Sequence, residues 1–354
     1  MKVLKIIFLN FLISLTIIIT IELLLGYWFD KNNFGQYMRE HRMKKNDYTL
    51  LLDGITYNFT YERNYYGFIG EHIEPRDIKA VFIGGSTADE RYKPRNLSIV
   101  ENLNKKLSNK NINLKIVNAG IEGQSTLGHL NNFKTWFKKL ENFNPKIIIF
   151  YVGINDYLAD LDNLNERKER DGLISNPNKK EMIFDYLKSS SIFYDLLRKI
   201  KHKYYKSDKP RVVYDFNKSI LELYKNKKFD FLNYDSALNK FDIKKITEQN
   251  QKRIDYYLKN IDELNKASKN IGAQAIFINQ LMSDGNNNET LFILNYSLIK
   301  HCKRKNYKCI DLGKKLNGKK DFWWDGIHTT IKGSKEISNL IFDDLIALIS
   351  LDNI

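Results

Sequence analysis

The sequence predicts an α/β protein in which a parallel sheet is covered by helices on both faces, preceded by one membrane-spanning helix. Short apolar stretches alternate with segments of helical periodicity along residues 79–345, which is typical of βαβ units. Ahead of them, residues 6–29 form an almost unbroken apolar stretch, about the length that crosses a bilayer. The chain has 354 residues, 43% apolar and 28% charged, which is the composition of a folded protein with a sizeable core.

The N-terminal stretch, IIFLNFLISLTIIITIELLLGYWF, is expected to be an uncleaved membrane anchor. It is longer than the apolar core of a usual signal peptide, and no small-x-small cleavage site follows Leu25. Tyr27 and Trp28 stand where an interfacial aromatic belt would lie, and Glu22 is within snorkelling reach of that interface. We therefore interpret Glu22 as a tolerated interfacial carboxylate and not as a proton relay.

Basic residues on the two sides of the anchor give opposite indications of its orientation. Lys2 and Lys5 favour a cytoplasmic N-terminus, whereas a second set of basic residues follows the helix and favours the reverse. Long domains translocate largely regardless of charge, so we expect a single-pass protein with its catalytic domain on the extracytoplasmic side. The second set comprises Lys31, Arg39, Arg42, Lys44 and Lys45.

After the anchor (residues 1–29), we expect a membrane-proximal lead-in (30–78) and one domain (79–354). Residues 157–245 break the βαβ rhythm, are rich in tyrosine and lysine, and are expected to form a helical insertion or lid over one edge. The expected strands are 79–83, 114–118, 146–152, 273–279 and 307–312, and the expected helices are 98–107, 128–140, 181–200 and 246–270.

Charge and motif content exclude several classes of function. The 57 Lys and Arg against 42 Asp and Glu give a net charge of +15, but no basic block accompanies a nucleic-acid-binding signature. The densest basic run, 198–211, is interpreted as a solvated or membrane-facing patch. No Walker, GxGxxG, CxxC or HExxH motif is present, so the sequence predicts neither a cofactor nor a metal ion.

The first catalytic candidate is Ser86, in KAVFIGGSTADE (79–90). It comes just after the first predicted strand of the domain, where open parallel sheets place their active sites. A glycine-serine turn on its own is weak evidence, because these are ordinary loop residues. Near the C-terminus, WWDGIHTTIKGS (323–334) places Asp325 three residues before His328, so one turn brings a carboxylate beside an imidazole. The three residues would form a nucleophile, a general base and its orienting acid.

Two further stretches supply candidate donors for a tetrahedral oxyanion. NAGIEGQST (118–126) and YVGINDY (151–157) follow the second and third expected strands. Gly123 would expose a backbone N–H, Asn155 its side-chain amide, and Ser86 its own N–H. Asn155 is alternatively a cap for the helix that follows.

Together these motifs resemble the SGNH or GDSL-like serine hydrolases over roughly residues 79–345. The resemblance implies a flavodoxin-like three-layer sandwich with about five strands, and esterase chemistry. Gly85 stands where many members carry Asp, and GGS resembles a variant of membrane-linked bacterial members. NYYGFIGEHIEP (64–75) is similar to the lead-in of such envelope proteins. The family's motif residues correspond to Ser86, Gly123, Asn155 and His328, with Asp325 as the third triad member.

Cys302 and Cys309 flank a helix-to-strand connection, and either a disulfide or two buried thiols is compatible with the sequence. Neither lies in a motif for a thiol nucleophile. The predicted function is that of a serine esterase acting through an acyl-serine, on O-acetyl or other short acyl esters of envelope carbohydrate. The alternatives are an acyltransferase to a glycan hydroxyl, a lipid esterase and a catalytically silent glycan-binding domain. The oligomeric state is not predicted.

Overall fold

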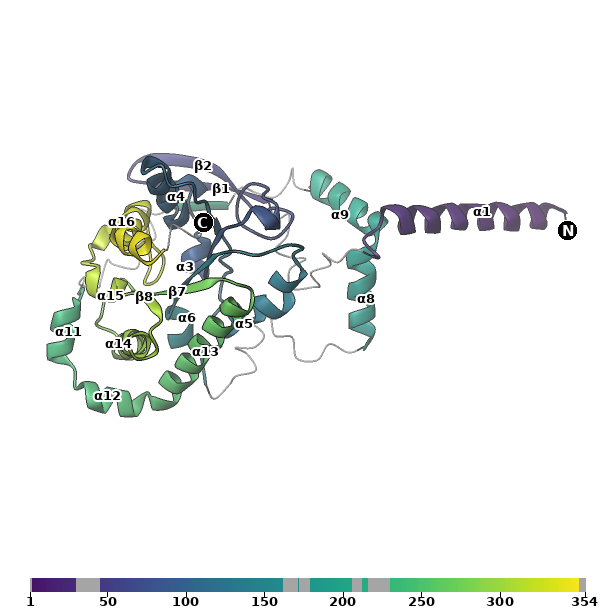
Figure 1. Ribbon diagram of the computed structural model, residues 1–354. Helices are drawn as coiled ribbons and strands as arrows, with labels where there is room; N and C mark the ends of the chain where they lie inside the picture. The colour runs from purple at the N-terminus through teal and green to yellow at the C-terminus, as the bar shows by residue number, and fades with distance from the viewer. Residues whose placement is uncertain are drawn as a thin grey trace.

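A computed structural model describes residues 2–29, 45–161, 171, 179–205, 212–215 and 230–349. Its centre is a five-stranded parallel sheet with strand order β4-β3-β5-β7-β8, the flavodoxin-like order expected from the resemblance (Figure 1). All its strands lie within the ranges predicted from sequence or within one residue of them. They are β3 (Ala80–Gly84), β4 (Ile116–Asn118), β5 (Ile147–Val152), β7 (Gln274–Asn279) and β8 (Lys308–Ile310).

The sheet is buried on both faces, which explains why its strands are continuous apolar runs instead of alternating ones. Along β5, Ile148, Phe150 and Val152 enter one core cluster, and Ile147, Ile149 and Tyr151 enter the other. The first core lies under α5 (Thr126–Thr135), α13 (Gln251–Asn270) and α14 (Glu289–Lys305), and the second under α4 (Ile99–Asn109) and α16 (Ile331–Leu348).

Several short helices and turns connect these layers. The 3-10 turns are Pro75–Asp77, Arg95–Leu97, Phe137–Lys139 and Lys320–Phe322, and the short α-helices are α3 (Ser86–Asp89), α6 (Ile154–Tyr157), α11 (Tyr234–Lys240), α12 (Ile243–Gln249) and α15 (Leu312–Lys315). The helix expected over 246–270 is thus two helices that divide at Asn250, whose side chain donates to the Ile246 carbonyl and ends α12.

A second, three-stranded sheet is the main feature that the sequence analysis did not predict. β1 (Lys45–Leu52) and β2 (Ile55–Glu62) form an antiparallel hairpin inside the expected lead-in. The two residues between them, Asp53 and Gly54, both have positive φ angles, as a tight hairpin turn requires. β6 (Val212–Asp215), from within the expected insertion, pairs with β1 in parallel. Residues 30–44, the rest of the lead-in ahead of β1, lie outside the described residues.

The N-terminal helix α1 (Lys2–Leu25) projects away from the body of the molecule (Figure 1). Its segment Val3–Leu25 is long and apolar enough to cross a membrane, a property that anchors share with signal sequences. At its end lie α8 (Lys179–Ser190) and α9 (Ile192–Tyr205), two helices where the sequence predicted one over 181–200. Cys302 and Cys309 form a disulfide between the last turns of α14 and strand β8.

Candidate active site

Ser86 is the first residue of α3, immediately after β3 and the Gly84–Gly85 pair. Both positions require glycine because neighbouring atoms leave no room for a side chain. A Cβ on Gly84 would lie 2.9 Å from the Tyr151 carbonyl oxygen, and a Cβ on Gly85 would lie 2.1 Å from the Asn155 amide nitrogen. The GGS sequence is therefore a tight strand-to-helix turn that places the serine hydroxyl at the carboxyl edge of the sheet.

His328 lies between Ser86 and Asp325. Its Nε2 is 2.9 Å from the Ser86 hydroxyl, and its Nδ1 donates to the Asp325 carboxylate at 2.6 Å. The other carboxylate oxygen, Oδ1, accepts the backbone N–H groups of Ile327 and His328, both at 2.6 Å. Because Asp325 can only accept while ionised, Nδ1 carries the imidazole proton and Nε2 is free to accept the serine proton.

The ionised form of Asp325 is favoured by its surroundings. Burial raises the pKa of the Asp325 carboxyl, but the hydrogen bonds and charge of His328 and the Ile327 N–H outweigh burial, so the pKa lies below its ordinary value. A charged Asp325 fixes the imidazole tautomer and would stabilise an imidazolium.

Asn155 lies against the glycine turn that precedes the candidate serine. The Asn155 amide, packed against Gly85, donates to the Gln124 carbonyl at 2.8 Å. The N-cap of α6 is Gly153, so the Asn155 side chain does not cap that helix. Gly123, the residue before Gln124, has a φ of +78° and, within the described part of the chain, open space where a Cβ would stand. The Asn155 amide and the loop of Gly123 are therefore in contact through Gln124, next to Gly85.

Behind α3, two clusters of polar and charged side chains connect the helix of Ser86 to neighbouring segments, and the first of them is fully buried. The histidine-side cluster consists of Glu90, Lys93, Thr329 and Ser334. Lys93 donates to Glu90 (2.8 Å), to the carbonyl and hydroxyl of Thr329 and to the Ser334 hydroxyl, joining the end of α3 to the residue after His328. All four residues are less than 9% exposed, so these hydrogen bonds are shielded from water. The cluster therefore holds the end of α3 and the loop of His328 at a fixed distance.

The oxyanion-side cluster consists of Arg63, Asp89, Arg91 and Glu122. Arg63, just past β2, donates to the Gly120 carbonyl and faces Asp89 at 3.5 Å. Arg91 pairs with both Asp89 and Glu122 at 2.5 Å. Burial raises the pKa of Asp89, but the two guanidinium groups outweigh it and hold that pKa below its ordinary value. The cluster joins the hairpin to α3 and to the loop that carries Gly123.

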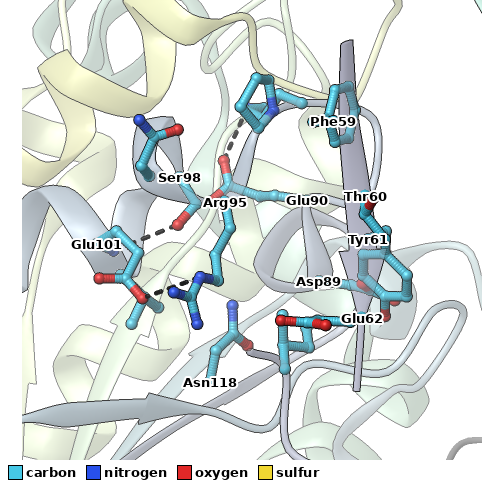
Figure 2. Close-up of a pocket in the computed structure, with 15 residues that line it drawn as sticks. Phe59, Thr60, Tyr61, Glu62, Asp89, Glu90, Arg95, Ser98, Glu101 and Asn118 are labelled. Atoms are coloured by element: carbon cyan, nitrogen blue, oxygen red, sulfur yellow. Dashed lines mark hydrogen bonds and ion pairs between the residues drawn. The ribbon is translucent and has the colours of Figure 1, made fainter. Parts of the chain in front are cut away.

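A cavity of about 280 Å³ lies between these clusters and the hairpin, as Figure 2 shows. Tyr61, Asp89, Glu90 and Arg95 line it, whereas none of the three predicted triad residues does. It therefore lies apart from the Ser86, His328 and Asp325 side chains.

Two aromatic rings contact His328, and a third ring packs against both of them. Tyr92 meets the imidazole edge to face at 5.4 Å, and Trp324 packs against it at 5.6 Å. Tyr214 of β6 contacts Tyr92 at 4.9 Å and Trp324 at 6.1 Å, so the expected insertion contributes to the rim. Burial and the nearby Glu122 raise the pKa of Tyr92, which keeps its hydroxyl protonated. Motif reading missed these rings because single aromatic residues carry no recognisable pattern.

Within the described ranges, no group of three or more His, Cys, Asp and Glu side chains is arranged to hold a metal ion.

The sequence matches the model of the GDSL-like lipase/acylhydrolase family over residues 80–341. No curated protein matches it. Similar solved structures include TesA (12% identity, 77% of this chain and 99% of that chain, TM-score 0.44). The esterase EstA from Pseudoalteromonas sp. is similar at 13% identity (77% and 98%, TM-score 0.42). A mutant of the acetylxylan esterase Axe2 from Geobacillus stearothermophilus is similar at 12% identity (76% and 94%, TM-score 0.43).

Proposed function

Because the chain belongs to the GDSL-like lipase/acylhydrolase family and is an ester-hydrolysing enzyme, we propose that it works through an acyl-enzyme on Ser86. The observation that carries this mechanism is the relay from the Ser86 hydroxyl through His328 to Asp325, with contacts of 2.9 and 2.6 Å. Both contacts are within the range for a nucleophile and its base, and the base is itself oriented by a third group.

In the first half-reaction, His328 Nε2 takes the proton of Ser86 as Oγ bonds to the ester carbonyl carbon. The carbonyl oxygen becomes an oxyanion, which the Asn155 amide and the N–H groups of Gly123 and Ser86 stabilise. The intermediate collapses when His328 returns the proton to the leaving alcohol, and the acyl group stays on Ser86. Water, deprotonated by His328, then cleaves the acyl-serine and releases the carboxylic acid.

For the substrate, we propose a short acyl ester, such as O-acetyl, on an envelope carbohydrate. The aromatic rim of Tyr92, Tyr214 and Trp324 supports this, since half-exposed Tyr and Trp offer a flat face and a hydrogen-bonding edge, as sugar rings require. A catalytic domain held at a membrane by one helix also reaches substrates near that surface.

We further propose that α1 is retained as the anchor and that the catalytic domain lies outside the cytoplasm. The disulfide between Cys302 and Cys309 supports this side, because disulfides persist in oxidising compartments. A reporter that is active only outside the cytoplasm, fused after Ile354, should be active. An inactive reporter on a stable fusion would place the domain in the cytoplasm.

Two experiments test the proposed chemistry and substrate. A fluorophosphonate probe should label the full-length protein but not Ser86→Ala, and absence of label on the wild type would favour a silent binding domain. The O-acetyl content of surface glycans should rise equally in a deletion strain and in one carrying Ser86→Ala. A fall would indicate an acyltransferase, and unchanged glycans with altered lipid acyl chains would indicate a lipid esterase.

A further inference from the structure

The carboxylate of Glu22, near the end of α1, is bound to the junction of α8 and α9. It accepts hydrogen bonds from the Ser191 hydroxyl and from the N–H groups of Ile192 (3.1 Å) and Phe193 (3.3 Å), the first residues of α9. The Trp28 indole donates to the same carboxylate at 3.0 Å. Glu22 therefore caps α9 from a different helix, a role that its own sequence neighbourhood does not reveal.

Other contacts tie α8 to the same point. The Tyr27 N–H donates to the Ser190 carbonyl (2.7 Å), and the Tyr186 hydroxyl donates to the Trp28 carbonyl (3.0 Å). The rings of Trp28 and Tyr186 meet edge to face at 5.8 Å. The last residue of α8 and the first residues of α9 consequently lie where the apolar segment of α1 ends.

Figure 1 shows how these helices lie. α8 runs across the axis of α1, whereas α9 runs obliquely from the end of α1 toward the body that carries the sheet, and both stand between α1 and that body. With 12 and 14 residues, they reach about 18 and 21 Å from their junction. If α1 crosses a bilayer, the two helices meet at its surface.

The exposed side chains of both helices are unusually apolar for a surface in contact with water. Eight large apolar side chains are at least 39% exposed, whereas isolated exposed apolar residues are the norm elsewhere on proteins. The α9 sequence also carries four Lys or Arg residues against one Asp. The exposed residues are Ile183, Phe184, Tyr186, Leu187, Tyr194, Leu196, Leu197 and Ile200.

We propose that α8 and α9 form a membrane foot: two interfacial helices that rest in the headgroup region of the bilayer entered by α1. This inference depends on the proposed anchoring, and it adds a second contact with the lipid. The occupant of the exposed face is lipid because the face continues directly from the end of α1, and because basic, apolar-faced helices are suited to an anionic lipid surface.

The foot is close in sequence to a strand that contributes to the candidate site. β6 begins seven residues after α9 in the sequence, pairs with β1 and places Tyr214 against Tyr92 and Trp324 beside His328. The expected insertion thus supplies both the proposed foot and one ring of the aromatic rim.

Fluorescence quenching in vesicles tests the foot directly. Single cysteines replace Phe184, Leu197, Ile13 or Ile55 in the full-length chain, whose native cysteines are paired, and each is labelled with an environment-sensitive dye. Ile13 reports on α1. Ile55, the first residue of β2, is a matched control because its 53% exposure lies between the 50% of Phe184 and the 63% of Leu197.

In vesicles containing phosphatidylglycerol, the labels on Phe184→Cys and Leu197→Cys should lose most of their emission to a nitroxide high on the lipid acyl chain. Ile13→Cys should respond most to a deep nitroxide, and Ile55→Cys only to aqueous iodide. Labels at 184 and 197 that behave like Ile55→Cys would overturn the foot and leave the anchor intact. Labels shielded from both quenchers would mean that protein covers this face, which also overturns it.

A label on Ile13→Cys that iodide quenches would refute the anchor and the foot together. Hydrolysis of an aryl acetate by the same samples reports on the proposed function independently. Normal turnover with an unembedded foot refutes only the foot.

Discussion

The two clusters behind the nucleophile helix differ in where their residues come from. The histidine-side cluster joins α3 to the loop of His328, and all its residues lie within the family-matched range. Lys93 donates a hydrogen bond to each of the other three members. The oxyanion-side cluster depends on Arg63 from the hairpin, outside that range. The hairpin is therefore joined through Arg63 to α3 and to the loop of Gly123, so residues outside the family-matched range contribute to the packing around Ser86.

The largest effect should come from removing the side chains of the proposed catalytic triad. Ser86→Ala and His328→Ala should each lower kcat for an aryl acetate by a factor on the order of 10⁶, and Asp325→Asn by about 10⁴, as in serine hydrolase triads. Turnover and thermal unfolding of the full-length protein in detergent would measure this. Normal activity of folded Ser86→Ala would refute the assignment of the nucleophile.

The oxyanion-side cluster is broken most directly by Arg63→Met. Arg63 is one of two guanidinium groups that face the buried Asp89, and it also donates to the Gly120 carbonyl, so the substitution should lower the free energy of unfolding by about 1.5–3 kcal/mol. Arg95→Met is the matched control, since its ion pair with Glu71 is substantially exposed and should contribute about 1 kcal/mol or less. Equal urea midpoints for the two variants would show that the hairpin does not support the site.

Asn155→Ala should act on catalysis and leave the fold largely unchanged. Loss of one oxyanion donor costs about 2.7–4 kcal/mol of barrier, or about 10²- to 10³-fold in kcat. Asn233→Ala is a suitable control because Asn233 caps α11, so it should lose about 1 kcal/mol of stability and keep its kcat. If Asn155→Ala showed the behaviour of the control, its role would be structural.

The smallest expected effect concerns acid stability on the histidine side. The folded pKa of Asp325 is below its unfolded value of about 3.9, so its stabilising contribution is fully present above about pH 4. That contribution should disappear as the pH falls through the lower folded pKa. The difference in unfolding free energy between the wild type and Asp325→Asn should therefore shrink between pH 6 and pH 3. A difference that stays constant or grows would contradict the assigned direction.

The sequence predicted the central sheet well because each buried strand, such as KIIIFYV, is a local apolar run between helices. The residues proposed as catalytic were found because they lie in short motifs: Ser86 follows a strand, and Asp325 and His328 precede the last helix. The pairing of β1 with β6 joins segments about 160 residues apart, and local patterns carry no record of it. The hairpin does have a local signal, since Asp53-Gly54 is a typical two-residue hairpin turn between two segments rich in strand-forming residues.

The buried polar contacts around α3 could not be predicted either, because their partners are mostly distant in the sequence. Lysine and arginine usually lie on the surface, so the sequence gives no sign that Lys93 and Arg63 are buried. Only the fold shows that each is surrounded by hydrogen-bond acceptors. The division of helix 181–200 at Ser191 likewise depends on Glu22, some 170 positions away.

The capping of α9 by Glu22 has a practical consequence for producing a truncated protein. Removing residues 1–29 deletes the acceptor for Ser191, Ile192 and Phe193 and leaves the apolar residues of α8 and α9 in water. A truncated chain should fray at the start of α9 and self-associate through exposed apolar surface. A well-behaved secreted form would have to lose the segment 179–205 as well, or carry polar substitutions at Phe184 and Leu197.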